Sequence, residues 1–255
     1  MELRTYRAFQ ALVLAGLGIY LINRIYTGRL FWYINARFLP LTLLGALGVL
    51  LLAQALLASR RPRSGQAEAD DHEHDHDHAH ERRPAGAARM LALLALPVAL
   101  GTLVPAAPLS AAAIDNRGLS SAAPLSVGAQ AGPVQFALAP EERTVLDWLR
   151  AFQQAADPAV HAGQPADVTG FVYHDPRLPA GQFLIARFTL TCCVADASAI
   201  ALLVEWPGAG DLPANTWVRA RGPIAVEGFD GRPFPMVRAE TVELVDPPDN
   251  PYLYP

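Results

Sequence analysis

The chain has 255 residues, of which 52% are hydrophobic and only 17% are charged, whereas typical soluble domains contain about 25% charged residues. This composition argues against a purely soluble protein. The formal net charge of −4 argues against a nucleic-acid-binding protein, because phosphate recognition needs a surplus of Lys and Arg. The two cysteines, Cys192 and Cys193, are adjacent, which excludes a framework built on disulfides.

Three apolar runs predict transmembrane helices in the first 113 residues, at 8–22, 38–58 and 90–113. A helix needs about 20 residues to cross the hydrocarbon core, which the second run provides outright. The first run is shorter, but the long side chains of Arg7 and Arg24 extend it by reaching the interface. A cleaved signal peptide is its alternative, disfavoured because no small-residue cleavage site follows. The third run contains prolines, which membrane helices tolerate, and its helical part is expected to end near Val104.

The distribution of arginine predicts the orientation, because cytoplasmic loops collect basic residues. The N-terminus and the second loop together hold eight arginines, against three in the first loop. The N-terminus and the second loop are therefore expected inside the cell, and with three crossings everything after residue 113 lies outside. The apolar runs contain no ionisable residue at depth, which argues against a transporter that works alone.

A run of histidines alternating with acidic residues occupies the second loop, residues 59–89. Its members are His72, His74, His76, His78 and His80. Such a polar, acidic stretch is expected to be disordered. Neutral imidazoles bind zinc, nickel, cobalt and copper, so we expect several weak sites for zinc or another divalent transition metal. The alternative is a solvated linker whose histidines have no role.

The remainder predicts a connector over 114–140 and an extracytoplasmic β domain over 141–255. A short amphipathic helix is expected at about 141–154, because Pro140 and acidic residues mark its start. Strand-like runs follow at 167–173, 182–193, 199–206, 217–224 and 236–244. Gly170 and Gly222 inside two of them suggest bends. Five short strands favour an OB-like β-barrel, with an open sandwich as the alternative.

Cys192, Cys193 and Asp196 are the candidate metal ligands of this domain. Adjacent side chains on a strand point to opposite faces, so the cysteines can share a metal only at a strand end or bulge, where Asp196 would bend the chain. A vicinal disulfide would be strained. The alternative is simple packing, with one cysteine buried and one partly exposed. His161 and His174 could add ligands, although their spacing does not require it.

Several short sequences resemble the YcgQ-like family of permease subunits, which are bacterial membrane proteins of unknown biochemical function. They are Tyr33-Ile34, Arg37-Phe38, Asp115-Asn116-Arg117-Gly118, Arg187-Phe188, Cys192-Cys193-x-Ala195-Asp196 and Pro251-Tyr252-Leu253-Tyr254-Pro255. The resemblance spans nearly the whole chain. It implies a partner, a larger multi-helix permease in the cell membrane, and it supplies no catalytic residues.

Two functional hypotheses follow, and neither is enzymatic. The sequence lacks a Gly-rich phosphate loop, a G-x-S-x-G elbow and an H-E-x-x-H helix, and a Cys192 or Cys193 nucleophile with His174 has little support. The first hypothesis is an accessory subunit of a two-component membrane permease, linked to zinc-like metal transport or handling. The second is a membrane-anchored extracytoplasmic binding module that works alone.

Overall fold

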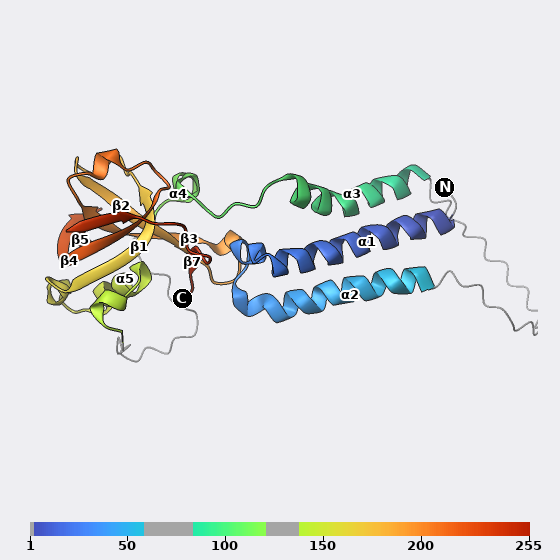
Figure 1. Ribbon diagram of the computed structural model, residues 1–255, viewed down its shortest axis with the longest axis horizontal. Helices are drawn as coiled ribbons and strands as arrows, with labels where there is room; N and C mark the ends of the chain where they lie inside the picture. The colour runs from blue at the N-terminus through green and yellow to red at the C-terminus, as the bar shows by residue number, and fades with distance from the viewer. Residues whose placement is uncertain (1–2, 59–83, 121–137) are drawn as a thin grey trace, which may run out of the picture. The chain divides into compact units, whose positions relative to one another are not determined.

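The computed structural model describes residues 3–58, 84–120 and 138–255 (Figure 1). The chain divides into two compact units, the first made of Met1–Leu30 and Ala36–Ala106 and the second of Phe31–Asn35 and Ala107–Pro255. The segment Phe31–Asn35 therefore belongs to the second unit, although in sequence it lies between two helices of the first.

The first unit contains three helices, α1 (Leu3–Tyr26), α2 (Leu39–Ala58) and α3 (Pro84–Leu103). Within the described residues, two stretches, Tyr6–Tyr26 and Ala36–Ala58, are long and apolar enough to cross a membrane by length and composition. The second run was predicted correctly to within one residue. The first helix is longer than the predicted 8–22, because the helix continues through Arg7 and Arg24 at its two ends.

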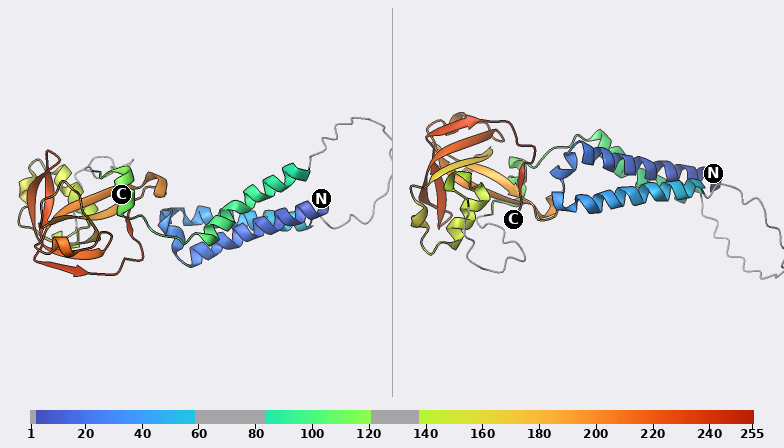
Figure 2. Two further views of the ribbon diagram at one scale, coloured as in Figure 1. Left: turned by 90° about the horizontal axis from the view of Figure 1, so that it is seen from above. Right: turned by 60° about the horizontal axis from the view of Figure 1, so that its bottom comes forward.

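Small residues line the contact between α1 and α2, which lie side by side in Figure 2. Ala11, Ala46 and Ala53 are buried. A Cβ added to Gly18 of α1 would lie 2.6 Å from Cγ of Leu50 on α2. Small residues let two backbones approach closely where no aqueous hydrophobic effect drives the helices together.

The end of α3 is tied to α1 through one carbonyl group. The oxygen of Gly101 would normally accept the amide of residue 105, but Pro105 has no N–H. Instead the Tyr20 hydroxyl donates to it at 3.1 Å, and the Arg24 guanidinium donates to the same oxygen. The helix ends at Leu103, next to the expected Val104, but it begins at Pro84, earlier than the expected residue 90.

The second unit is built on a mixed seven-stranded sheet. Its strands are β1 (Pro165–Tyr173), β2 (Gln182–Thr189), β3 (Ser198–Glu205), β4 (Trp217–Phe229), β5 (Arg232–Arg238), β6 (Thr241–Leu244) and β7 (Tyr252–Leu253). The order is β1-β2-β3-β5-β4-β6, with β7 beside β2 and an additional pairing of β1 with β4. The pairs β3–β5 and β2–β7 are parallel and the others are antiparallel.

The core lies between this sheet and the helix α5 (Val145–Gln154). Almost every residue of β2 and β3 is buried, so these strands lack the polar alternation of a half-exposed strand, and the buried residues are apolar except for Arg187 and Thr189 of β2. The helix packs against β1, β2, β3 and β5 (Figure 1), and it buries Trp148 and Leu149 completely against them. Burial of such large side chains is the main stabilising contribution.

The expected strand set was incomplete at its C-terminal side. The predicted strand 236–244 is two strands, β5 and β6, and β4 continues past Ile224 to Phe229. Asp230 and Gly231 both have positive φ and join β4 to β5 as a two-residue hairpin, the turn that Asp-Gly favours. Pro233 and Pro235 concealed β5, because proline is depleted in strands.

Two helical predictions also need correction. The predicted helix 141–154 begins at Val145, because Thr144 and Asp147 form a reciprocal capping box; Pro140–Glu142 is a separate 3-10 turn. The predicted third apolar run extended to residue 113, but Ala111–Arg117 forms a separate helix, α4, in the second unit. Its end at Gly118, with φ of 80°, uses a conformation that glycine adopts readily.

Gly170 tests how tightly the strands approach one another. A Cβ at this position would lie 2.6 Å from the carbonyl oxygen of Ala186 on β2, so we expect Gly170→Ala to lower the free energy of unfolding by about 1–3 kcal/mol through overpacking. Gly228→Ala in β4 is the matched control, because open space surrounds it, and it should be neutral or slightly stabilising. Thermal unfolding of the full chain, followed by tryptophan fluorescence, makes the comparison. Equal losses for both variants would contradict this explanation.

Candidate functional site

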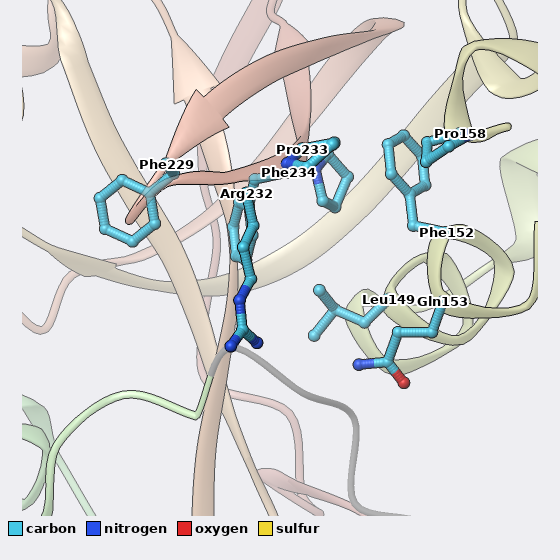
Figure 3. A pocket seen from close by; sticks show the side chains of 9 residues that line it. Leu149, Phe152, Gln153, Pro158, Phe229, Arg232, Pro233 and Phe234 are labelled. Atoms are coloured by element: carbon cyan, nitrogen blue, oxygen red, sulfur yellow. The ribbon is translucent and has the colours of Figure 1, made fainter.

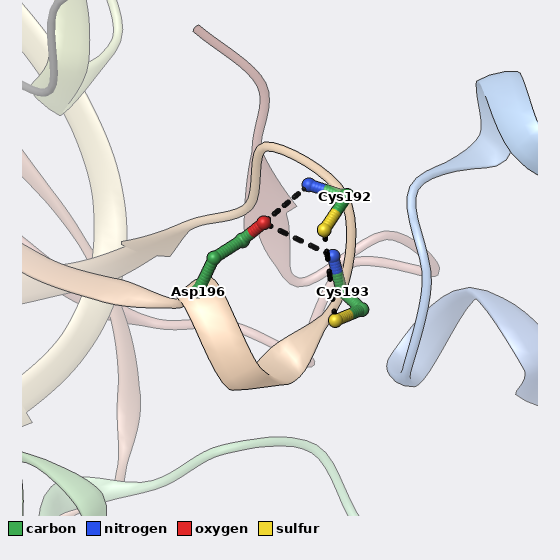
Figure 4. A group of neighbouring side chains, drawn as sticks. All are labelled: Cys192, Cys193 and Asp196. Atoms are coloured by element: carbon green, nitrogen blue, oxygen red, sulfur yellow. Dashed lines mark hydrogen bonds between the residues drawn. The ribbon is translucent and has the colours of Figure 1, made fainter.

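The two cysteines lie in a loop after the end of β2, not within a strand (Figure 4). The predicted strand ran through Cys193, whereas β2 ends at Thr189, four residues earlier. The short 3-10 helix η5 (Val194–Asp196) follows directly, with Cys193 as its N-cap. The strand end that sequence reasoning required for a shared site is therefore present.

The carboxylate of Asp196 organises this loop. Its Oδ1 accepts the amide of Thr191 at 2.9 Å, and its Oδ2 accepts the amides of Cys192 at 2.6 Å and Cys193 at 3.4 Å. Burial alone would raise the pKa of Asp196, but the hydrogen bonds from Cys192, Thr191 and Cys193 outweigh it and hold that pKa below its usual value. A charged acceptor is suited to several amides at once, so Asp196 stays ionised while it folds the chain back.

The fold of the loop brings the two sulfur atoms together. Sγ of Cys192 and Sγ of Cys193 are 3.7 Å apart, and one ligand atom from each of Cys192, Cys193 and Asp196 lies within 4.8 Å of the others. Both cysteines are free thiols, with Cys192 exposed and Cys193 half-buried. The expectation of one buried cysteine in the packing alternative is therefore wrong, because neither side chain is fully buried.

The carboxylate also changes the chemistry of the exposed thiol. Asp196, followed by Cys193 and by burial, raises the pKa of Cys192 to about 11. The thiolate is the nucleophile in cysteine chemistry, so this environment disfavours Cys192 as a nucleophile. The same negative charge of Asp196 would attract a cation held between the two sulfurs.

The segment Phe31–Asn35 pairs with the cysteine loop from the far end of the sequence. The Asn35 amide donates to the Cys192 carbonyl at 2.9 Å, and the Val194 amide donates to the Tyr33 carbonyl at 2.9 Å. Ile34 and Cys193 form the antiparallel bridge between these bonds. The buried side chain of Asn35 adds a bond from its Nδ2 to the Thr191 carbonyl at 3.1 Å.

Arg117 holds the same loop from the side of α4. Its guanidinium Nη1 donates to the carbonyl of Val194 at 2.7 Å and to that of Ala197 at 3.4 Å. These two oxygens flank the start and end of η5. The loop is thus held by a carboxylate from within and by backbone and guanidinium donors from two distant segments.

The C-terminal residues complete the surroundings of the loop. β7 pairs with the end of β2, and the Leu190 amide donates to the Leu253 carbonyl at 3.0 Å. Arg187, buried in β2, donates to the carbonyls of Pro251 at 3.1 Å and Asn250 at 3.4 Å. Burial lowers the pKa of Arg187 to about 10, so it remains charged at neutral pH and anchors this end of the chain.

Several sequence candidates do not join the site. Among the described residues, the close group of possible metal ligands consists of Cys192, Cys193 and Asp196 alone. His174 Nε2 lies 2.7 Å from the Leu212 carbonyl, and His161 stacks on Phe152 with its Nε2 3.2 Å from a backbone carbonyl. His72, His74, His76, His78 and His80 lie outside the residues that the structure describes.

A hollow of about 420 Å³ lies beside α5, lined mainly by apolar side chains (Figure 3). Its lining comprises Leu149, Phe152, Gln153, Pro158, Phe229, Arg232, Pro233, Phe234 and Pro235. Arg232 is the one charged side chain in this lining, so the hollow offers neither a group of metal ligands nor an acid–base pair.

Asn35 was missed by sequence reasoning, and Arg117 was noted only as part of a resembling motif. Asn35 sits between two expected membrane spans, in a loop to which the sequence analysis assigned no binding role. Arg117 sits in the expected connector. Their shared role depends on contacts across more than 70 residues of sequence, which local spacing does not encode.

Two family models match the chain, the DUF1980 N-terminal domain over residues 9–120 and the DUF1980 C-terminal domain over residues 141–255. The chain belongs to the DUF1980 family. The expected YcgQ-like resemblance is thereby confirmed. The UPF0703 protein YcgQ of Bacillus subtilis is 29% identical over 101 residues, which cover 38% of this chain and 35% of that protein. The chain therefore matches about a third of the length of YcgQ.

A second relative, from Streptococcus mutans, carries the name "Putative two-component membrane permease complex subunit". It is 24% identical over 198 residues, 64% of this chain and 72% of that protein. This name describes the Streptococcus mutans relative as a subunit of a membrane permease complex. A small single-stranded DNA-binding protein from Streptomyces coelicolor is 10% identical, with 32% of this chain and 93% of that chain covered and a TM-score of 0.23, which is too low to establish a shared fold.

The effect of Asp196 on the exposed thiol is directly testable. In a Cys193→Ser chain, adding Asp196→Asn should shift the pH dependence of Cys192 alkylation to lower pH and speed the reaction at pH ~8 by about three- to tenfold. Each unit by which the pKa falls raises the thiolate fraction about tenfold. The gain in rate is smaller than this because a less basic thiolate attacks more slowly. Iodoacetamide rates across pH measure this. Asp211→Asn, at an exposed carboxylate outside the loop, should leave the profile unchanged; an identical shift there would refute the assignment.

Proposed function

We propose that this protein is the accessory subunit of a two-component membrane permease, with its β domain on the extracytoplasmic side. The observation that carries the proposal is the pairing of Tyr33–Asn35 with the cysteine loop. The segment that connects two membrane-sized helices is built into the β domain. A binding module on a simple tether does not need such a bond between its sheet and its anchor. The family and the name of the Streptococcus mutans relative agree with this role.

The same pairing supports our proposal of three membrane crossings. If α1 and α2 both cross, the segment Phe31–Asn35 and the end of α2 lie on opposite sides of the membrane. The β domain contains Phe31–Asn35, so the chain must cross once more between Ala58 and Ala107. α3, with 20 residues, has the length for that crossing. The arginine distribution then supports an intracellular N-terminus and histidine run.

We also propose an OB-like barrel for the sheet. The pairings run from β1 through β2, β3, β5 and β4, and β4 pairs with β1 again. A sheet that returns to its first strand has no free edge along this path, as in a small closed barrel. The close backbone approaches at Gly170 and Gly222 suit the bends that such a barrel requires.

The link to metal handling has two parts. Cys192 and Cys193 bring two sulfur donors together beside the Asp196 carboxylate, in the domain that we propose to be extracytoplasmic, and sulfur donors favour zinc and other borderline or soft cations. The sequence from His72 to His80 supplies imidazoles for weak binding of the same class of cation on the other side. We propose zinc or a similar divalent transition metal as the ion, with no resident catalytic role for it.

Co-purification tests the subunit role. Tagged full-length chain captured from native membranes in mild detergent is expected to bring down one multi-helix membrane protein in a fixed ratio. The reason is that an accessory subunit forms a stable contact surface with its partner subunit. A chain that stays alone, while the purified protein still binds a ligand, would support the stand-alone binding module and contradict the proposal.

Thiol labelling tests the topology without any fusion, because the chain contains only Cys192 and Cys193 and Cys192 is exposed. In intact cells a membrane-impermeant maleimide should label the natural chain. A Cys192→Ser/Cys193→Ser chain that carries Ser64→Cys in the second loop should be labelled only after the membrane is permeabilised. The reverse pattern would place the β domain in the cytoplasm.

A further inference from the structure

We infer that Cys192 and Cys193 form a two-sulfur chelate for one tetrahedral, zinc-class cation, shaped by Asp196 and open to donors from outside this chain. The inference deepens the proposed function, on which it rests for its biological use, by naming the coordination of the cation. The geometry of the isolated chain supplies the argument.

The separation of the two sulfurs selects the coordination geometry. With metal–sulfur bonds of about 2.3 Å, two sulfurs on one ion lie roughly 3.3 Å apart at a right angle, about 3.8 Å at the tetrahedral angle and about 4.6 Å in a linear arrangement. The observed Sγ–Sγ distance is 3.7 Å. The loop therefore already holds the thiols at the spacing of a tetrahedral edge, the geometry that zinc adopts with sulfur ligands.

The break in strand geometry explains how adjacent cysteines reach this arrangement. In a strand their side chains would point to opposite faces. Cys193 instead occupies the N-cap of η5, and Figure 4 shows both sulfurs on the inner side of the loop, the side of Asp196, with a gap between them. A divalent cation entering this gap displaces two thiol protons to solvent and forms two metal–sulfur bonds, which leaves a neutral bis-thiolate unit.

Asp196 acts as a positioning residue for this site. Its two oxygens already accept three backbone amides, from Thr191, Cys192 and Cys193. A carboxylate offers about four acceptor positions, so most of its capacity is committed to the loop. Its charge still favours a cation nearby.

Two of the four tetrahedral positions are then left for other donors. Structural zinc sites are closed by four protein ligands, whereas functional sites keep open positions. In the described part of the chain, no further His, Cys, Asp or Glu joins this group. The open positions therefore suit water or a donor group of a second molecule. A cation held by two protein ligands can be transferred from this site to such a molecule.

The cysteine loop is also bonded to the segment that directly precedes a helix of the first unit, so cation binding in the loop can affect that segment. The Cys192 carbonyl accepts the Asn35 amide, and Ala36, the next residue, belongs to the helical unit. Ordering Cys192 and Cys193 around an ion will also order the strand pair that they form with Tyr33–Asn35. The integrity of that pair should in turn affect binding.

Cadmium titration of the full-length chain in detergent tests the site. Cadmium is a tetrahedral analogue of zinc, and its sulfur-to-cadmium charge-transfer absorption reports thiolates but not the imidazoles of the histidine run. With a phosphine reductant, the absorption should saturate at one equivalent per chain and disappear when zinc displaces cadmium. X-ray absorption should count two sulfurs at each cadmium.

Single variants separate the site from general effects. Cys192→Ser and Cys193→Ser should each weaken cadmium binding by at least about a hundredfold, consistent with loss of one of two metal–sulfur bonds, while thermal unfolding stays unchanged at this accessible loop. Asn35→Ala should weaken it by about three- to tenfold, the loss expected of one supporting hydrogen bond. Asn116→Ala, whose side chain donates to the Ala112 carbonyl within α4, is its matched control.

The results that would overturn the inference are equally defined. They are a missing absorption band, a band that survives in Cys193→Ser, or saturation at half an equivalent with four sulfurs, which would mean a site between two chains. A failed titration together with intact co-purification would remove the cation site alone. A normal titration without any permease partner would remove the subunit role alone.

Discussion

The hydrogen bonds that tie Tyr33–Asn35 to Cys192–Val194 are the constraint on which the arrangement of the β domain around its cysteine loop depends. They join a segment near the start of the chain to a loop more than 150 residues later. Backbone pairing of this kind is directional and satisfies groups that would otherwise need water. The segment has only five residues and no room to form a sheet of its own.

Around this pairing, segments from the whole chain meet. Asp196 supplies the inner turn, Arg117 the carbonyl contacts beside η5, and Arg187 the anchor for the C-terminal residues. Tyr252 connects two further segments of the chain, because its hydroxyl accepts the Leu109 amide and donates to the Trp32 carbonyl. The short sequences that suggested the family are thus not scattered markers. Most of them lie around one loop, which gives a physical reason for their presence together.

The negative charge of Asp196 beside the two thiols makes the loop better suited to binding a cation than to nucleophilic catalysis. A carboxylate that raises the pKa of Cys192 works against a cysteine nucleophile, and the same charge works in favour of a bound cation. Asp196 also accepts hydrogen bonds from the loop backbone, so the sulfurs are held in place before any ion binds. Such preorganisation reduces the cost of ordering on binding.

Composition and periodicity alone determined the membrane character, the 38–58 helix, the helix ahead of the β domain and the presence of several strands, because apolar length and local spacing depend on neighbouring residues only. The sequence also located the candidate ligands Cys192, Cys193 and Asp196. It could not decide whether the two sulfurs face one another, since that depends on where β2 ends and on which carboxylate accepts the loop amides. The β4–β5 hairpin, the strand β7 and the roles of Asn35 and Arg117 were settled only by the tertiary structure, because each depends on groups brought together across long stretches of chain.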